Sequence, residues 1–227
     1  MSSVAELIID YLNRNRVSTT EVADCLGKSG AICEVMPINR GHYCAGLIKY
    51  VYTYDESNWE VHRQIANIEE GKIIFVESFN CAGRAIFGEL VSKYLLLYRQ
   101  SKAIVALGKM RDAAALIREN YPIWCIGFNP VGCFNRKPDS GKDITVMKES
   151  YEKYENAIAV CDDCGVVVIP KEEITLEFLK KLENFESQED IWFDRLDHFK
   201  ENTFQIVCEK QYLTDKKYMQ QRLESVK

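Results

Sequence analysis

Three short apolar runs in the middle of the chain set the strongest limit on its fold. Residues 72–76, 103–107 and 123–128 are strand-sized, and segments with helical spacing separate them. Apolar runs without alternation are typical of strands that are buried on both faces. Strands that alternate with helices predict an α/β domain, and the closely spaced later strands, residues 157–160 and 166–169, predict a mixed sheet.

Both ends of the chain predict helices. Apolar residues recur at helical spacing over residues 4–12. Ser18 and Glu21 then form a capping-box signature for a second helix at residues 19–26. From residue 171 the pattern is charged and helical, with Trp192 and Phe199 on one apolar stripe. This stripe favours a packed core or a subunit interface over a cofactor site.

Composition excludes several classes of protein. The chain has 227 residues, of which 47% are hydrophobic, so it can bury a full core. A net charge of −5 without a basic stripe argues against direct binding of nucleic acid. No apolar run approaches the roughly 20 residues of a membrane span. The N-terminus does not resemble a secretory signal, and the nine cysteines are an odd number, so we expect a cytoplasmic protein with reduced thiols.

Two short segments carry the best functional clue. Gly88, Glu89, Leu90 and Val91 lie in an apolar stretch, residues 85–99, that predicts a buried helix. Free amides and the positive end of a helix dipole suit a substrate carboxylate. The second segment, Gly108-x-x-Arg111-Asp112, follows a predicted strand, and a helix is expected from Asp112 to Arg118. The spacing predicts that the two segments meet at the ends of neighbouring elements.

Arg111 and Asp112 offer complementary chemistry. Arg111 presents a permanently charged fork of donors, which stabilises an oxygen that gains negative charge. Asp112 is a hard oxygen ligand for Mg²⁺ or Mn²⁺, ions that keep several waters. Together they suit a reaction through an enolate, with a metal-bound water or Glu89 moving the proton. The plainer alternative is that Asp112 only begins a helix while Arg111 forms a surface ion pair.

A wider set of motifs resembles a known family. The order is Gly88-Glu89-Leu90, then Gly108-x-x-Arg111-Asp112-Ala113, then Asp162-Asp163-Cys164-Gly165 with the apolar run to Pro170. Over residues 18–170 this is similar to the family of the regulator of ribonuclease activity A and the 4-hydroxy-4-methyl-2-oxoglutarate aldolases. The resemblance implies a swivelling β/β/α domain at residues 1–173, with a C-terminal helical extension at 174–227, and trimers or hexamers with sites near subunit boundaries.

The resemblance also implies functional roles. In the aldolase branch Gly88, Glu89, Leu90 and Val91 would line the carboxylate of a small 2-oxo acid substrate, Arg111 would contact substrate and Asp112 would bind the metal. The regulator branch binds a ribonuclease instead and is shorter, so the long tail here favours the aldolase branch. A regulatory protein without catalysis, or an enzyme for a larger anionic substrate, remains open.

The chain departs from the family pattern at two places. Residues 99–102 and 154–156 stand where the family usually has glycines and Pro-Gly-Asp, respectively, which leaves the shape of the pocket and the substrate open.

Three further signals carry less weight. Cys161 and Cys164 have the spacing of a zinc half-site, but a strand turn explains them better because the sequence offers no second pair of that spacing. Residues 129–133 form either a pocket wall or an ordinary turn, and a catalytic Cys133 would need a base that the sequence does not identify. Residues 135–142 predict a loop that covers or borders a site.

Overall fold

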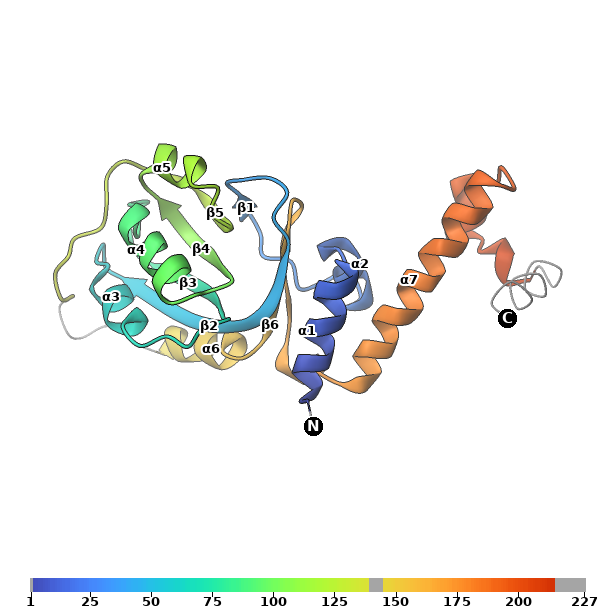
Figure 1. Ribbon diagram of the computed structural model, residues 1–227, viewed down its shortest axis with the longest axis horizontal. Helices are drawn as coiled ribbons and strands as arrows, with labels where there is room; N and C mark the ends of the chain where they lie inside the picture. Colours follow the sequence, from blue (N-terminus) through green and yellow to red (C-terminus); the bar gives the residue numbers. More distant parts are fainter. Residues whose placement is uncertain (1, 139–144, 215–227) are drawn as a thin grey trace. The chain divides into compact units, whose positions relative to one another are not determined.

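The predicted sheet lies in the first of two compact units, residues 1–179 and 180–227. The computed structural model describes residues 2–138 and 145–214. Among these residues, seven strands form one mixed sheet of order β1-β5-β4-β3-β2-β6-β7 (Figure 1). The predicted α/β class, with a mixed sheet, N-terminal helices and C-terminal helices, is confirmed. The predicted domain limit at residue 173 stays a prediction.

The long second strand links the parallel and the antiparallel parts of the sheet. Strands β2 to β5 run parallel, whereas β1, β6 and β7 pair antiparallel with their neighbours. The amino half of β2 pairs with β6, and the half from Ile48 onward pairs with β3. The strand bounds are β1 Met36–Pro37, β2 Cys44–Tyr54, β3 Ile73–Phe79, β4 Ala103–Met110, β5 Ile123–Phe128, β6 Ile158–Asp162 and β7 Gly165–Ile169.

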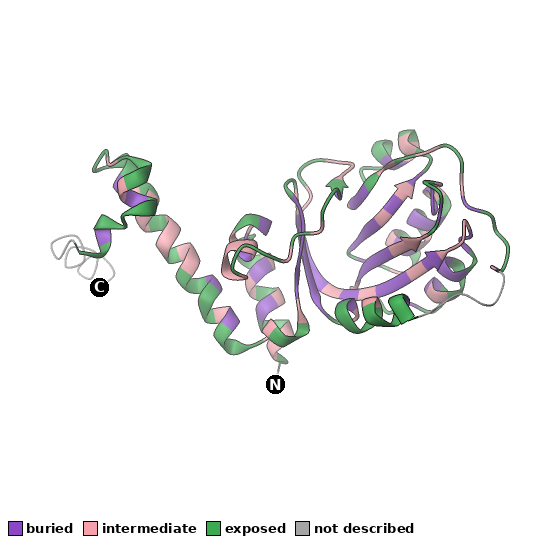
Figure 2. Cartoon of the chain, turned by 180° about the vertical axis from the view of Figure 1, so that it is seen from behind, coloured by how far each residue is buried: buried purple, intermediate pink, exposed green. Residues whose placement is uncertain are grey.

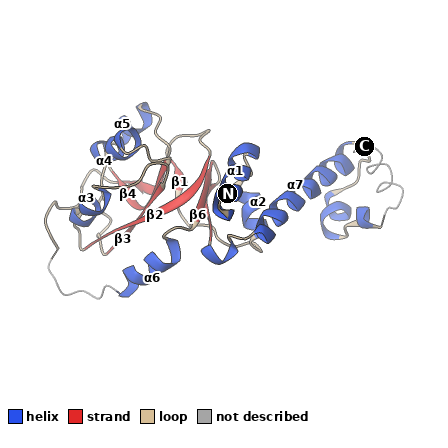
Figure 3. Cartoon of the chain, turned by 60° about the horizontal axis from the view of Figure 1, so that its bottom comes forward, coloured by secondary structure: helices blue, strands red, loops and turns tan. Residues whose placement is uncertain are grey.

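The helices of the first unit cover both faces of the sheet (Figure 3). The two N-terminal helices begin with capping boxes, at Ser3 with Glu6 and at Ser18 with Glu21, the second as predicted. The helix bounds are α1 Val4–Asn15, α2 Thr19–Cys25, α3 Trp59–Ile65, α4 Glu89–Lys93 with a π-helix at Tyr94–Tyr98, α5 Ala113–Arg118, α6 Thr145–Tyr154 and α7 Leu176–Asp197.

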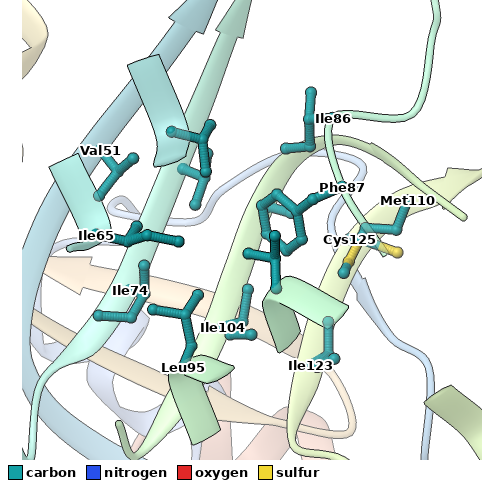
Figure 4. Close-up of a cluster of buried hydrophobic side chains, with 14 of the residues drawn as sticks. Val51, Ile65, Ile74, Ile86, Phe87, Leu95, Ile104, Met110, Ile123 and Cys125 are labelled. Atoms are coloured by element: carbon teal, nitrogen blue, oxygen red, sulfur yellow. The ribbon is translucent and has the colours of Figure 1, made fainter. Parts of the chain in front are cut away.

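Both faces of the central strands are buried (Figure 2). One face carries Ile74 and Ile104 under α3, α4 and α5, and Figure 4 shows this cluster. The opposite face carries Phe75 and Trp124, with Tyr154 of α6 packed against them. Because both faces of the central strands are buried, nearly every residue of these strands is apolar, which explains the continuous apolar runs in the sequence.

The predicted helix at residues 85–99 is wrong in its first part. Ala85 and Ile86 are extended, because their amides donate to the carbonyls of Val131 and Lys109, at 2.8 Å each. These bonds join the segment to two other parts of the chain and replace the local bonds of a helix. The helix begins only at Glu89. Helix α6 was not predicted, and residues 139–142 of the predicted loop lie outside the described residues.

The second unit has its own polar contacts. Trp192 of the predicted apolar stripe donates through Nε1 to the hydroxyl of Tyr212, at 3.1 Å. Arg195 is buried and donates through Nε to Glu201, at 2.9 Å, while its guanidinium lies over the ring of Phe199. Over residues 2–138 and 145–214, the helices are too short or too polar to cross a membrane.

Candidate functional site

Arg111 and Asp112 lie where β4 ends and α5 begins. The amide of Arg111 donates to the carbonyl of Phe87 at 3.0 Å, which ties the end of β4 to the segment before α4. Asp112 adopts the left-handed conformation with φ 61°, which aspartate tolerates better than most residues. Both side chains remain about half exposed, at 51% and 43%. The two predicted residues are thus fixed by their backbone and open to solvent.

The carboxylate of Asp112 fills the space beside Gly88. Its Oδ2 accepts a hydrogen bond of 3.0 Å from the amide of Glu89, the first residue of α4. A Cβ atom on Gly88 would lie 2.1 Å from the same oxygen. Asp112 therefore caps α4 from outside, and one amide that we expected to hold a substrate carboxylate is already engaged.

Arg111 is positioned between Asp112 and Gly132. Its Nε lies 3.7 Å from Asp112 Oδ2, and a Cβ atom on Gly132 would lie 2.8 Å from its Nη1. The carbonyl of Gly132 accepts from Arg84 Nη1 at 3.2 Å. Segment 129–133 thus lies beside Arg111, as the pocket-wall interpretation requires. The sequence did not predict that Arg84 would lie next to this segment. A basic residue between a predicted strand and a predicted helix was the one feature that could have indicated it.

The side chains of Glu89, Leu90 and Val91 point to other neighbours. The Glu89 carboxylate lies 3.9 Å from Arg118 Nη2 on α5. Leu90 and Val91 line a groove of about 350 Å³ together with residues of α3 and Tyr94. A contact of Leu90 or Val91 with substrate at the Asp112 site would therefore have to come from the backbone amide.

Asp112 is a suitable single ligand for a hard divalent ion. Its Oδ2 bonds to the Glu89 amide, which leaves Oδ1 as the oxygen that can face an ion. Among the residues that the structure describes, no cluster of three or more His, Cys, Asp or Glu side chains could hold a metal. Mg²⁺ and Mn²⁺ fit such a site, because they accept one carboxylate and complete their shell with waters and substrate oxygens.

The two departures from the family pattern lie far from this site. Residues 99–102 precede β4 and Arg111 follows it, so the whole strand of 8 residues separates them. Asn156 donates to the carbonyl of Ile48, and Ile48 pairs with Ile73 at the start of β3. Because β3 and β4 are parallel, both departures lie at the edge where these strands begin. They do not shape the surroundings of Arg111.

The zinc half-site is not supported. Asp162 ends β6 and Gly165 begins β7, so the predicted strand turn is confirmed. Cys161 is fully buried and lies directly opposite Cys44 on the neighbouring strand β2. Burial raises the pKa of Cys161 well above its ordinary value, which disfavours the thiolate that zinc needs.

Comparison with known proteins decides the family. The family model described as RraA-like, Aldolase/RraA, matches residues 19–168. The chain belongs to the RraA-like family. These residues contain strands β1 to β6, all of β7 except Ile169, and Gly88, Arg111 and Asp112, whereas the C-terminal helices lie outside the match. The RraA-like family includes both aldolases and regulators that are not catalysts.

The RraA-like fold recurs in proteins of low sequence identity. An uncharacterised protein of Pseudomonas syringae matches with a TM-score of 0.61 and 18% identity, over 86% of this chain and 94% of that one. Streptomyces coelicolor RraAS2 is described as an unusual member of the RNase ES inhibitor RraA protein family. It matches with a TM-score of 0.60 and 18% identity, over 83% of this chain and 96% of that one.

One curated relative is much longer. Protein DlpA of Legionella pneumophila is 20% identical over 177 residues, which is 76% of this chain and 29% of DlpA. The chain therefore spans less than a third of the length of that relative.

Proposed function

We propose that this protein is a divalent-metal-dependent carbon–carbon lyase, an aldolase that acts on a pyruvate-like 2-oxo acid such as 4-hydroxy-4-methyl-2-oxoglutarate. The observation that carries the proposal is the grouping of Arg111 and Asp112, both exposed, against two glycines. Gly88 makes room for the carboxylate, and Gly132 makes room for the guanidinium. A surface ion pair alone would not need either glycine.

Asp112 would hold Mg²⁺ or Mn²⁺ through Oδ1. When bound, the ion would supply Lewis-acid polarisation of the 2-oxo group. The amide of Glu89 fixes Oδ2, so the carboxylate keeps one orientation before any ion or substrate arrives. Holding a ligand in its working geometry lowers the cost of binding.

Arg111 would stabilise the negative oxygen that develops as the carbon–carbon bond breaks. Its guanidinium stays protonated at any working pH, so it acts as a charge stabiliser and not as a base. Gly132 and Asp112 limit where the group can move. Preorganised donors of this kind contribute about 10²–10³ in turnover.

The remaining parts of the site have smaller roles. The amides of Leu90 and Val91, next to the engaged amide of Glu89, would hold the substrate carboxylate at the start of α4. The Glu89 carboxylate or a water would move the proton. We also propose that the protein assembles as trimers or hexamers, as the family resemblance implies, which light scattering after size-exclusion chromatography measures.

Turnover of oxaloacetate and of 4-hydroxy-4-methyl-2-oxoglutarate tests the proposal. Pyruvate release should require Mg²⁺ or Mn²⁺ and stop with a chelator. Arg111→Ala and Asp112→Ala should each lower kcat/KM by about 10²-fold or more. Arg63→Ala is the matched control, since Arg63 is an exposed arginine paired with Glu60 on α3. Unchanged turnover in both site variants would refute the lyase.

A regulatory protein of the same family is the second candidate. The observation in its favour is a row of exposed apolar side chains along α4 and the π-helix, at Leu90, Leu97 and Tyr98. Large exposed apolar side chains are typical of surfaces that bind proteins. Absence of metal-dependent turnover on both acids, together with a stable partner that Leu97→Asp releases, would favour this function.

A further inference from the structure

Two cysteines from separate loops meet behind the wall of the site. Cys81 follows β3, and Cys133 ends the segment that carries Gly132. Both belong to the core cluster under α3 and α4, with exposed fractions of 7% and 9%. A hydrogen bond between the two thiols shifts the pKa of each, and the Cys81 thiol also donates to the carbonyl of Phe79 at 3.5 Å. Neither residue has a role in the proposed lyase.

Backbone bonds hold the two loops in register around Ala85. The amide of Cys133 donates to the carbonyl of Ala85 at 2.8 Å, and the amide of Ala85 donates to Val131 at 2.8 Å. On the other side, the amide of Arg84 donates to the carbonyl of Cys81 at 2.9 Å. These bonds fix the backbone on which both cysteines stand, through the same segment, residues 84–85.

The two thiols differ in acidity. The hydrogen bond from Cys133 is the largest effect that lowers the pKa of Cys81, while the same bond, with burial, raises the pKa of Cys133. The lowered pKa favours the thiolate form of Cys81, whose thiol, while protonated, donates to the carbonyl of Phe79 at 3.5 Å. This asymmetry is the arrangement of an attacking cysteine with a resolving cysteine.

We propose that Cys81 and Cys133 form a reversible disulfide when the protein meets a peroxide. The sulfur of Cys81 attacks the O–O bond and becomes a sulfenic acid, and the oxygen that leaves is released as water after protonation. The sulfur of Cys133 then displaces the second oxygen as water and closes the S–S bond. Each thiol loses one hydrogen, and the peroxide is reduced to two waters.

The disulfide would act on the site through Gly132. An S–S bond of about 2.05 Å is much shorter than a contact between two hydrogen-bonded sulfurs, so its formation draws the two loops together. Gly132 precedes Cys133 and lies against the guanidinium of Arg111. This consequence rests on the proposed function and predicts a lower kcat/KM for oxaloacetate in the oxidised protein, by about tenfold for a shift worth 1.4 kcal/mol.

Peptide mapping of the full chain after treatment with hydrogen peroxide tests the modification without relying on activity. We expect a cross-linked peptide that joins Cys81 to Cys133, lost again on reduction with dithiothreitol. Cys133→Ala and, separately, Cys81→Ala should abolish it. The matched control is Cys161→Ala, because Cys44 and Cys161 are also a pair of neighbouring cysteines, directly opposite each other on β2 and β6, and Cys161 is fully buried.

The outcomes separate the two proposals. Absence of the Cys81–Cys133 peptide, or accumulation of sulfinic acid on Cys81 in its place, would overturn the disulfide. A disulfide that leaves kcat/KM unchanged would overturn its effect on the site. A disulfide that forms in a protein without lyase activity in either state would support the modification and count against the lyase alone.

Discussion

A methyl group on residue 88 would compete with Asp112 for the same space. The Cβ of Gly88→Ala would lie 2.1 Å from Asp112 Oδ2 and 2.7 Å from Arg111 Cγ. Both distances are far below van der Waals contact, so the Asp112 side chain must rotate away. The φ of Gly88 is −148°, outside the left-handed region that favours glycine, so the contacts of the added methyl group are the main effect of the substitution. The variant therefore displaces the Asp112 carboxylate from its position at the start of α4, where it accepts a hydrogen bond from the amide of Glu89.

The size of the effect follows from the hydrogen bond that is lost. A bond to a charged acceptor contributes about 1.5–3 kcal/mol. Asp112 is 43% exposed, so solvent replaces part of the bond and we expect a loss of about 1–2 kcal/mol in the free energy of unfolding. If the carboxylate must hold a metal, kcat/KM should fall by more than tenfold, since each factor of ten corresponds to about 1.4 kcal/mol in the barrier.

A double-mutant cycle provides the assay. Urea unfolding of the unchanged protein, Gly88→Ala, Asp112→Ala and the double variant gives four free energies of unfolding. Without the carboxylate the new methyl group loses its closest contact, so the two costs should not add, and the interaction energy should be about 1–2 kcal/mol. Additive costs would show that Gly88 and Asp112 act independently, and the geometry proposed for the site would then be refuted.

Three other variants test separate parts of the structure. Gly132→Ala should shift only the end of the Arg111 side chain, so stability should stay within about 0.5 kcal/mol while the KM for oxaloacetate rises; an unchanged KM contradicts this. Glu155→Ala removes an acceptor of two hydrogen bonds at the far edge of the sheet, and should cost about 1–3 kcal/mol of stability without changing kcat/KM. Because its pKa is lowered, Cys81 should react with iodoacetamide at lower pH than an ordinary thiol, and Cys133→Ala should move that midpoint upward; an unmoved midpoint would show that the hydrogen bond is not the cause.

The sequence alone predicted the elements whose signal is local. The runs that became β3, β4 and β5 are apolar at nearly every position because both faces of these strands are buried. The cap at Ser18 and the turn after Asp162 were predicted for the same reason, since neighbouring residues form them. The order of three motifs, Gly88-Glu89-Leu90, Gly108-x-x-Arg111-Asp112-Ala113 and the segment from Asp162 to Pro170, also indicated the family.

Only the tertiary structure decided how these residues meet. Ala85 is extended because it forms backbone hydrogen bonds with Val131 and Cys133, which lie more than forty positions away in the chain. The helical spacing of apolar residues in 85–99 does not indicate these partners. Contacts between distant segments are set by packing, which can override local propensity. The place of Gly132 against Arg111, and the use of Asp112 to cap a helix other than its own, were decided in the same way.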